Sequence, residues 1–109
     1  MTIPAGSLVW VSGQLGVDAD GNVVDGGWEA QTRVAFENVG RGLRAAGVDW
    51  PDVVKFTFFV LDVAEVATIR AVRDEFVSAD APPTSSLVQV AGLVRPGALI
   101  EIEAVAHAG

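Results

Sequence analysis

The sequence predicts an α+β domain in which a single mixed β-sheet carries two helices on one face. Segments with apolar residues at alternating positions are separated by two segments with apolar residues at helical spacing, which gives the order β-β-α-β-α-β-β. The length of 109 residues suits one domain, so we expect residues 1–109 to fold as a single unit.

The N-terminal part contains a predicted hairpin. Ser7 to Ser12 is rich in Val and Trp, which favours a strand, and Ser12-Gly13 ends it. Asp20-Gly21-Asn22 is typical of a tight turn, and we expect a short second strand at Val23-Val24.

The first helix is expected from about Trp28 to Ala46. Asp25 is the candidate N-cap, and Gly47 is placed to end the helix in the left-handed conformation. One face of the segment is apolar at helical spacing, as in a helix that packs on a sheet: Ala35, Val39, Leu43 and Ala46.

The C-terminal part supplies the rest of the sheet and the second helix. Val53 to Asp62 is largely apolar on both alternating faces, which is typical of a central strand. Ala64 to Ser78 has helical spacing, and Pro82-Pro83 cannot continue that helix. Two strands are expected to close the chain: Ser85 to Leu93 and Leu99 to His107.

Two helices on one face would leave the other face of the sheet uncovered. Half of the residues are apolar and the mean hydropathy is +0.42, although a monomer of this size buries only about two-thirds of its unfolded surface. Uncovered apolar faces are usually buried by association, so the sequence predicts an interface between copies of the chain.

The composition excludes several classes of function. A net charge of −7 without any Lys/Arg cluster argues against nucleic acid and anionic membranes as partners. With no cysteine, the chain has no disulfide, thiol nucleophile or thiolate metal site. The longest apolar stretch, Phe56 to Val66, is shorter than the about 20 residues of a membrane span, and Met1 to Pro4 does not resemble a secretory signal. We therefore expect a cytoplasmic protein.

One motif match has a simpler explanation. Asp18, Asp20, Asn22 and Glu29 fall at ligand positions of a calcium-loop pattern, but Val23 stands where that loop needs glycine and no helix precedes it. A hairpin turn accounts for these residues, and no other metal or cofactor motif is present. We expect neither a metal nor a cofactor.

Six segments, spread from the first strand to the last, resemble the RidA/YjgF family. The resemblance covers Leu8 to Ala106 and implies a chorismate-mutase-like fold, with three sheets meeting in a homotrimer and the helices outside. Family members usually have a further N-terminal edge strand and a tyrosine near the ligand cleft. Only a short segment precedes Leu8, so either this strand, which forms one wall of the cleft, is missing or the chain is cut short. The matching segments are Val11-Ser12-Gly13-Gln14, Gln31-Thr32-Arg33, Glu37-Asn38, Ala45-Ala46-Gly47, Asp52-Val53-Val54-Lys55 and Ile100-Glu101-Ile102-Glu103-Ala104.

Ser85 is the main departure from that family. Members that hydrolyse reactive enamines and imines carry Pro-Ala-Arg-Ser here, whereas this chain reads Pro83-Thr84-Ser85-Ser86. In the family, the arginine binds the carboxylate of a 2-imino acid through two parallel hydrogen bonds, which a hydroxyl cannot provide. Losing it costs on the order of a hundredfold in affinity or rate. Arg70 and Arg73 on the second helix could replace it; alternatively they form a solvated face with ion pairs such as Arg70 with Asp74.

Glu101 is the candidate catalytic residue, because it matches the family glutamate thought to position the hydrolytic water. Glu101, Glu103 and His107 alternate along the last strand and share one face. Alternatively, both glutamates are solvated or paired with Lys55 or an arginine, and a histidine so near the C-terminus is more often solvated than a base.

Other candidate binding groups surround the ends of the strands. Ser12, Gly13 and Gln14 form a turn whose backbone amides could meet a ligand, and Ser86 could hold substrate. Phe58 and Phe59 could line a pocket, although packing in the core or trimer is the simpler explanation.

Two functions remain open. The first is an enamine/imine deaminase in which water near Glu101 attacks the C=N carbon. The second, which the absence of the arginine favours, is a divergent, non-deaminating trimer that binds or acts on another small metabolite in its inter-subunit clefts. Some family members were described as ribonucleases, an activity that the acidic composition does not support. A purely structural trimer is weaker, because the Ser12-Gly13-Gln14 turn and Glu101 are retained.

Overall fold

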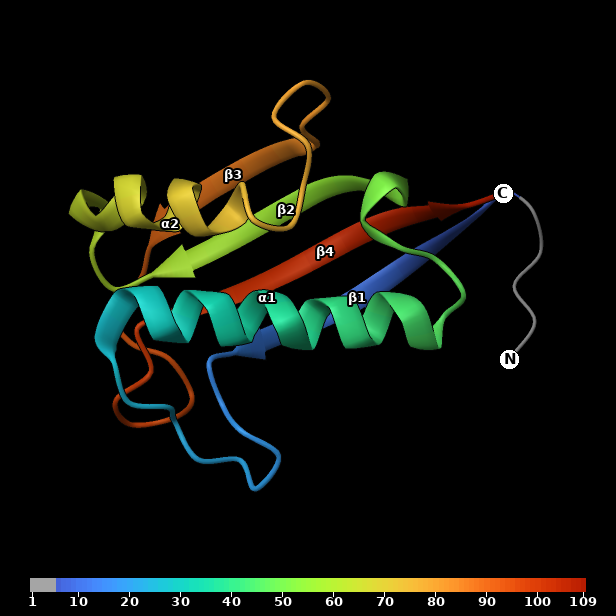
Figure 1. Ribbon diagram of the computed structural model, residues 1–109. Coiled ribbons are helices and arrows are strands. Elements are labelled where there is room, and N and C mark those ends of the chain that lie inside the picture. Colours follow the sequence, from blue (N-terminus) through green and yellow to red (C-terminus); the bar gives the residue numbers. More distant parts are fainter. Residues whose placement is uncertain (1–5) are drawn as a thin grey trace.

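The computed structural model describes residues 6–109 and confirms the predicted α+β class (Figure 1). Two short 3₁₀ helices, Trp50–Asp52 and Val63–Glu65, precede β2 and α2 respectively. The main elements are β1 (Ser7–Leu15), α1 (Gly27–Ala45), β2 (Val53–Val60), α2 (Val66–Arg73), β3 (Thr84–Gln89) and β4 (Ile100–Ala108).

The four strands form one mixed sheet in the order β1-β4-β2-β3. β4 pairs antiparallel with β1 and β2, whereas β2 and β3 are parallel. β2 therefore lies inside the sheet, as its two apolar faces predicted, and β1 and β3 form the edges. Both helices lie on the same face of the sheet (Figure 1).

The predicted second strand at Val23-Val24 is wrong. Val23 makes only an isolated antiparallel bridge with Val17, so the element order is β-α-β-α-β-β. The carboxylate of Asp18 accepts hydrogen bonds from the backbone N–H groups of Asp20 and Asn22, at 3.0 and 2.9 Å. The Gly21 N–H also donates to the carbonyl of Asp18, so these bonds close a local turn, and the segment forms no ladder beyond the single bridge.

The predicted helix boundaries also need correction. Asp25 does not cap α1; the cap position is Gly26, with φ of 110° and no side-chain cap hydrogen bond. Glycine has no Cβ to clash in this left-handed conformation, and this decides where the helix begins. Gly47, with φ of 82°, ends the helix as predicted. α2 is shorter than the expected Ala64 to Ser78 at both ends. Val63–Glu65 before it form a 3₁₀ helix in which the Ala64 N–H donates to Asp62, and residues 74–76 after it form a turn.

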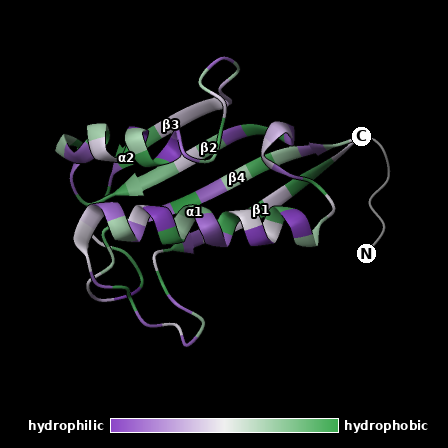
Figure 2. Ribbon diagram, in the orientation of Figure 1, coloured by the Kyte–Doolittle hydropathy of each residue, from purple (hydrophilic) through white to green (hydrophobic). Residues whose placement is uncertain are grey.

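The hydrophobic core consists of buried apolar residues of the strands and of the two helices. Figure 2 shows hydrophobic positions along the strands and along both helices. Phe36 of α1 is fully buried at its centre. Its ring centroid lies 5.1 to 6.0 Å from those of four other aromatic residues, which come from three separate segments: Trp50, Phe56, Phe58 and Phe76. Phe58 is thus a core residue.

No helix of residues 6–109 covers the opposite face of the sheet. Leu8 and Trp10 of β1 are 56% and 72% exposed, and Val88 of β3 is 42% exposed. The register places Trp10 opposite Val105 and Val88 beside Phe59. Each strand thus contributes an apolar residue to this face, and the polar residues Lys55, Thr57, Glu101 and Glu103 lie between the two pairs. We refer to this surface as the open face.

Two polar side chains of α1 hold the loops at one end of the sheet. Gln31 is 4% exposed; its Nε2 donates to the carbonyl of Gly97 and its Oε1 accepts from the N–H of Leu99. Asn38 donates to the carbonyls of Leu15 and Val17. These bonds fix the exit of β1 and the entry to β4.

An ion pair joins α1 to the segment after α2. Arg33 donates to the carboxylate of Glu75, with a shortest N–O distance of 2.6 Å, and also to Glu29 at 3.2 Å. The hydrogen bond to Arg33 lowers the pKa of Glu75 below its ordinary value of 4.5, and the Glu75 and Glu29 bonds raise the pKa of Arg33. Both partners are partly exposed, so the pair contributes little in neutral buffer.

The Glu75 pair predicts a pH effect on stability. A carboxyl whose pKa is lower in the folded than in the unfolded chain stabilises the fold above its ordinary value and loses that contribution as the pH falls through the folded pKa. We expect the melting temperature of the wild type to fall more between about pH 6 and about pH 3 than that of Glu75→Gln. Thermal melts across this range test it, and equal slopes would contradict it.

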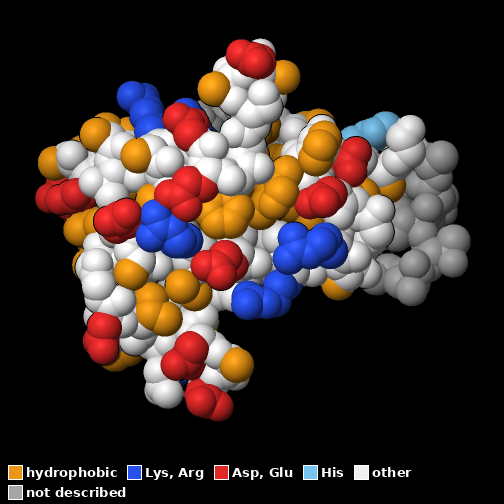
Figure 3. Space-filling view, in the orientation of Figure 1, with side chains coloured by type: hydrophobic (Ala, Val, Ile, Leu, Met, Phe, Trp, Pro, Cys, Tyr) orange, Lys and Arg blue, Asp and Glu red, His pale blue; other side chains and the backbone are white. Residues whose placement is uncertain are grey.

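No helix in the range 6–109 is long and apolar enough to cross a membrane. On the face that carries the helices, acidic and basic side chains are interspersed (Figure 3).

Candidate functional site

Glu101 and Gly13 meet on the open face. The register between β1 and β4 shifts between Val11 and Gln14, and this irregularity contains Ser12 and Gly13. A Cβ atom at Gly13 would lie 2.5 Å from Cδ and 2.6 Å from Oε1 of Glu101, so the glutamate side chain rests directly on the glycine backbone. Only glycine leaves room for a carboxylate here.

The Glu101 carboxylate is half-buried and has no ion-pair partner within the described part of the chain. The alternative expectation, a pair with Lys55 or an arginine, is therefore not met for Glu101 or Glu103 in the single chain. Phe59 lies opposite Glu101 in the sheet and supplies an apolar neighbour. The amide of Gln14 donates to the carbonyl of Ser12 at 3.0 Å, within the irregular segment.

Ser85 lies on the other side of the sheet. It is directly beside Phe56, whose side chain is fully buried against the helices. Ser85 lines a small cavity of about 50 Å³ between β3 and α2, together with Arg70 and Arg73 and an apolar floor that includes Phe58. The structure thus gathers the hydroxyl and both candidate arginines at one place.

The two arginines differ in their partners. Arg73 donates to the neighbouring Asp74 at 3.0 and 3.1 Å, which takes the place of the expected Arg70–Asp74 pair. Arg70 is exposed and forms no ion pair among residues 6–109. Arg70 is consequently the cation that can turn most easily toward a ligand beside Ser85.

Within one chain, the site residues fall into two groups. Phe56 pairs with both Ser85 and Ala104, so Ser85 faces the helices, whereas Glu101 is three residues from Ala104 and faces the open side. Within one subunit, Glu101 and Ser85 therefore lie on opposite faces of the sheet. Ser86 pairs with Thr57 and faces the open side.

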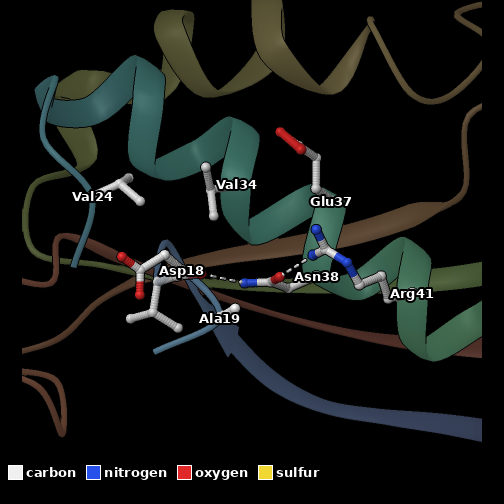
Figure 4. Close-up of a pocket in the computed structure, with 8 residues that line it drawn as sticks. Asp18, Ala19, Val24, Val34, Glu37, Asn38 and Arg41 are labelled. Carbon is white, nitrogen blue, oxygen red and sulfur yellow. Dashed lines mark hydrogen bonds between the residues drawn. The ribbon is translucent and has the colours of Figure 1, made fainter. Parts of the chain in front are cut away.

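The sequence did not predict two features of the structure. The first is the contact between Gly13 and Glu101, and the second is a cleft beside α1 (Figure 4). The contact depends on the register of β1 against β4, for which strand periodicity gives no signal. The cleft is lined by residues from 17–24 and from 34–41, and no short motif spans both segments.

The chain matches, over residues 1–108, the model of a family described as endoribonuclease L-PSP. Among solved structures, it resembles RidA from the Antarctic bacterium Psychrobacter with a TM-score of 0.87 and 34% identity, over 96% of this chain and 84% of that one. The chain belongs to the RidA/YjgF family.

Other members of the RidA/YjgF family are similarly close. A 2-iminobutanoate/2-iminopropanoate deaminase of Bos taurus is 37% identical over 102 residues, which cover 93% of this chain and 73% of that protein. The structure of E. coli TdcF with bound serine has a TM-score of 0.84 and 35% identity, over 98% of this chain and 85% of that one.

Proposed function

We propose that this RidA/YjgF protein is a homotrimer that binds a small metabolite in the clefts between subunits, and that it is a divergent member without efficient 2-imino acid hydrolysis. The observation that carries the proposal is Ser85, because the family resemblance implies an arginine at this position in members that hydrolyse imines. The hydroxyl of Ser85 offers one neutral hydrogen bond, whereas an arginine guanidinium would form a charged, bidentate pair with a carboxylate. We also propose a cytoplasmic location.

The separation of the two residue groups supports a site made by two subunits. β3 is an edge strand, so the group around Ser85 is accessible to a neighbouring chain. Glu101 faces the open side, which an adjacent sheet would cover. A cleft that contains both Ser85 and Glu101 therefore needs residues from two copies.

The chemistry of the lining indicates the kind of metabolite. Arg70 and Arg73 beside Ser85 suit a carboxylate, and the adjacent floor of Phe58 and Leu87 suits a short apolar part. The backbone amides of the Ser12–Gln14 segment add donors near Glu101. Net charge −7 argues against RNA as the ligand, despite the description of the family model.

One observation favours the alternative of an imine deaminase: Arg70 and Arg73 lie where they could replace the missing guanidinium. In that reaction, water held by Glu101 adds to the C=N carbon while the nitrogen takes up a proton. The resulting carbinolamine then expels ammonia and leaves a 2-keto acid. Glu101 would accept one proton of the water and pass it to the imine nitrogen during addition, and it would then carry the hydroxyl proton of the carbinolamine to the nitrogen as the C–N bond breaks.

Hydrolysis of freshly generated 2-iminobutyrate separates the two functions. We expect the wild type to match the uncatalysed rate and Ser85→Arg to exceed it by at least about tenfold, since the variant restores a charge-assisted contact. Ser86→Arg is the matched control, because it adds the same charge on the other face of β3. Clear catalysis by the wild type would overturn the proposal in favour of the deaminase.

The trimer gives a separate prediction. Light scattering should give three times the chain mass for the wild type and a smaller mass for Trp10→Asp, because the substitution puts a charge on the open face. Val94→Asp, at a loop position that is 84% exposed, serves as the control and should stay trimeric. A monomeric wild type would refute the assembly.

A further inference from the structure

A second cleft lies between residues 17–24 and α1, on the side of the helix turned away from α2 (Figures 1 and 4). Its volume is about 430 Å³, which is within the range of small-molecule sites. It includes none of the residues of the proposed inter-subunit site. Apolar side chains of Val17, Val24 and Val34 form part of its wall.

Asn38 lines this cleft, and its side-chain amide makes three hydrogen bonds there. Its Nδ2 donates to the carbonyls of Leu15 and Val17 at 3.0 and 3.1 Å, and its Oδ1 accepts a hydrogen bond from Nη1 of Arg41. Figure 4 shows the Arg41 guanidinium turned toward Asn38, while Glu37 points elsewhere. The amide therefore positions Arg41 at the cleft and leaves the other guanidinium N–H groups available.

The charges of the lining are mixed. Arg41 is the one cation, and Asp18 and Glu37 supply two carboxylates; none of the three forms an ion pair within residues 6–109. Oδ1 of Asp18 is occupied by the two N–H groups of its own turn, which leaves Oδ2 for another donor. A simple anion would meet a net negative lining on an acidic protein.

We propose that this cleft binds a free α-amino acid with an aliphatic side chain. The ligand's carboxylate pairs with Arg41, its ammonium group pairs with Oδ2 of Asp18, and its side chain packs on the valines. A zwitterion satisfies both signs of charge without adding net charge, and the apolar wall selects an aliphatic over a polar side chain.

The test uses the full chain and L-leucine as the probe, with amide chemical shifts followed by NMR. We expect saturable shifts confined to residues 17–24 and 34–41. Isoamylamine and isocaproate carry the same side chain with only the ammonium or only the carboxylate, and each should bind at least about tenfold more weakly than leucine. No shifts, or equal binding of either analogue, would overturn the proposal.

Two arginine substitutions on α1 locate the contact. Arg41→Gln should weaken leucine binding at least about tenfold, because it removes the charge-assisted bonds to the carboxylate. Arg44→Gln, on the same helix but outside the cleft, should bind leucine as the wild type does. Equal losses in both variants, or shifts at Ser85 and Glu101 instead, would refute the site. The imine assay on Ser85→Arg tests the inter-subunit site separately, so its outcome does not depend on whether leucine binds to this cleft.

Discussion

Phe36→Ala is expected to lower the free energy of unfolding by about 3–5 kcal/mol, the range for truncating a fully buried phenylalanine. Phe36 is 0% exposed and packs against aromatic rings from four positions, including a stacked contact with Phe76 at 5.1 Å and 12° between planes. Its neighbours come from the sheet and from the segments after both helices. They cannot all move inward to fill one cavity, which places the cost in the upper part of that range.

Urea denaturation of the Phe36 variant measures this loss, with Val94→Ala as the control. Val94 is 84% exposed, so its truncation should change stability by less than about 0.5 kcal/mol. If Phe36→Ala loses less than about 1 kcal/mol, the aromatic cluster is not the centre of the core.

Gly13→Ala is expected to remove most of the imine hydrolysis that Ser85→Arg gains, a loss of about tenfold or more, while it changes stability little. The new methyl would lie 2.5 Å from Cδ of Glu101, so the carboxylate must move away from the β1 irregularity. Because the clashing atoms are the end of a flexible side chain, the rotation is cheap for the fold. A displacement of about 1 Å is costly for catalysis.

The readout is imine hydrolysis in the Ser85→Arg background, where activity is expected. Gly13→Ala added to that background should remove most of the gain, and urea midpoints should stay close to the parent's. Glu101→Gln is the comparison variant, since it keeps the shape of the side chain and removes the charge. Gly13→Ala with full activity would show that the position of Glu101 over Gly13 does not matter for the reaction.

Local sequence patterns determined most of the secondary structure. The α+β class, the two helices and the central place of β2 follow from periodicity, because apolar side chains must face the core whatever their partners are. Gly47 ended its helix as predicted, since only glycine adopts its φ of 82° without strain. The strand at Val23-Val24 failed because its turn is satisfied by Asp18, without a sheet ladder.

The amino-acid sequence by itself determined the fold class and the family. Only the tertiary structure decided which of the candidate residues meet: Ser85 with Arg70 and Arg73 on one side of the sheet, and Gly13 with Glu101 on the other. The reason is physical. A residue type and its periodicity are local properties, but contact across a sheet depends on strand order and register, which the packing of the whole chain sets.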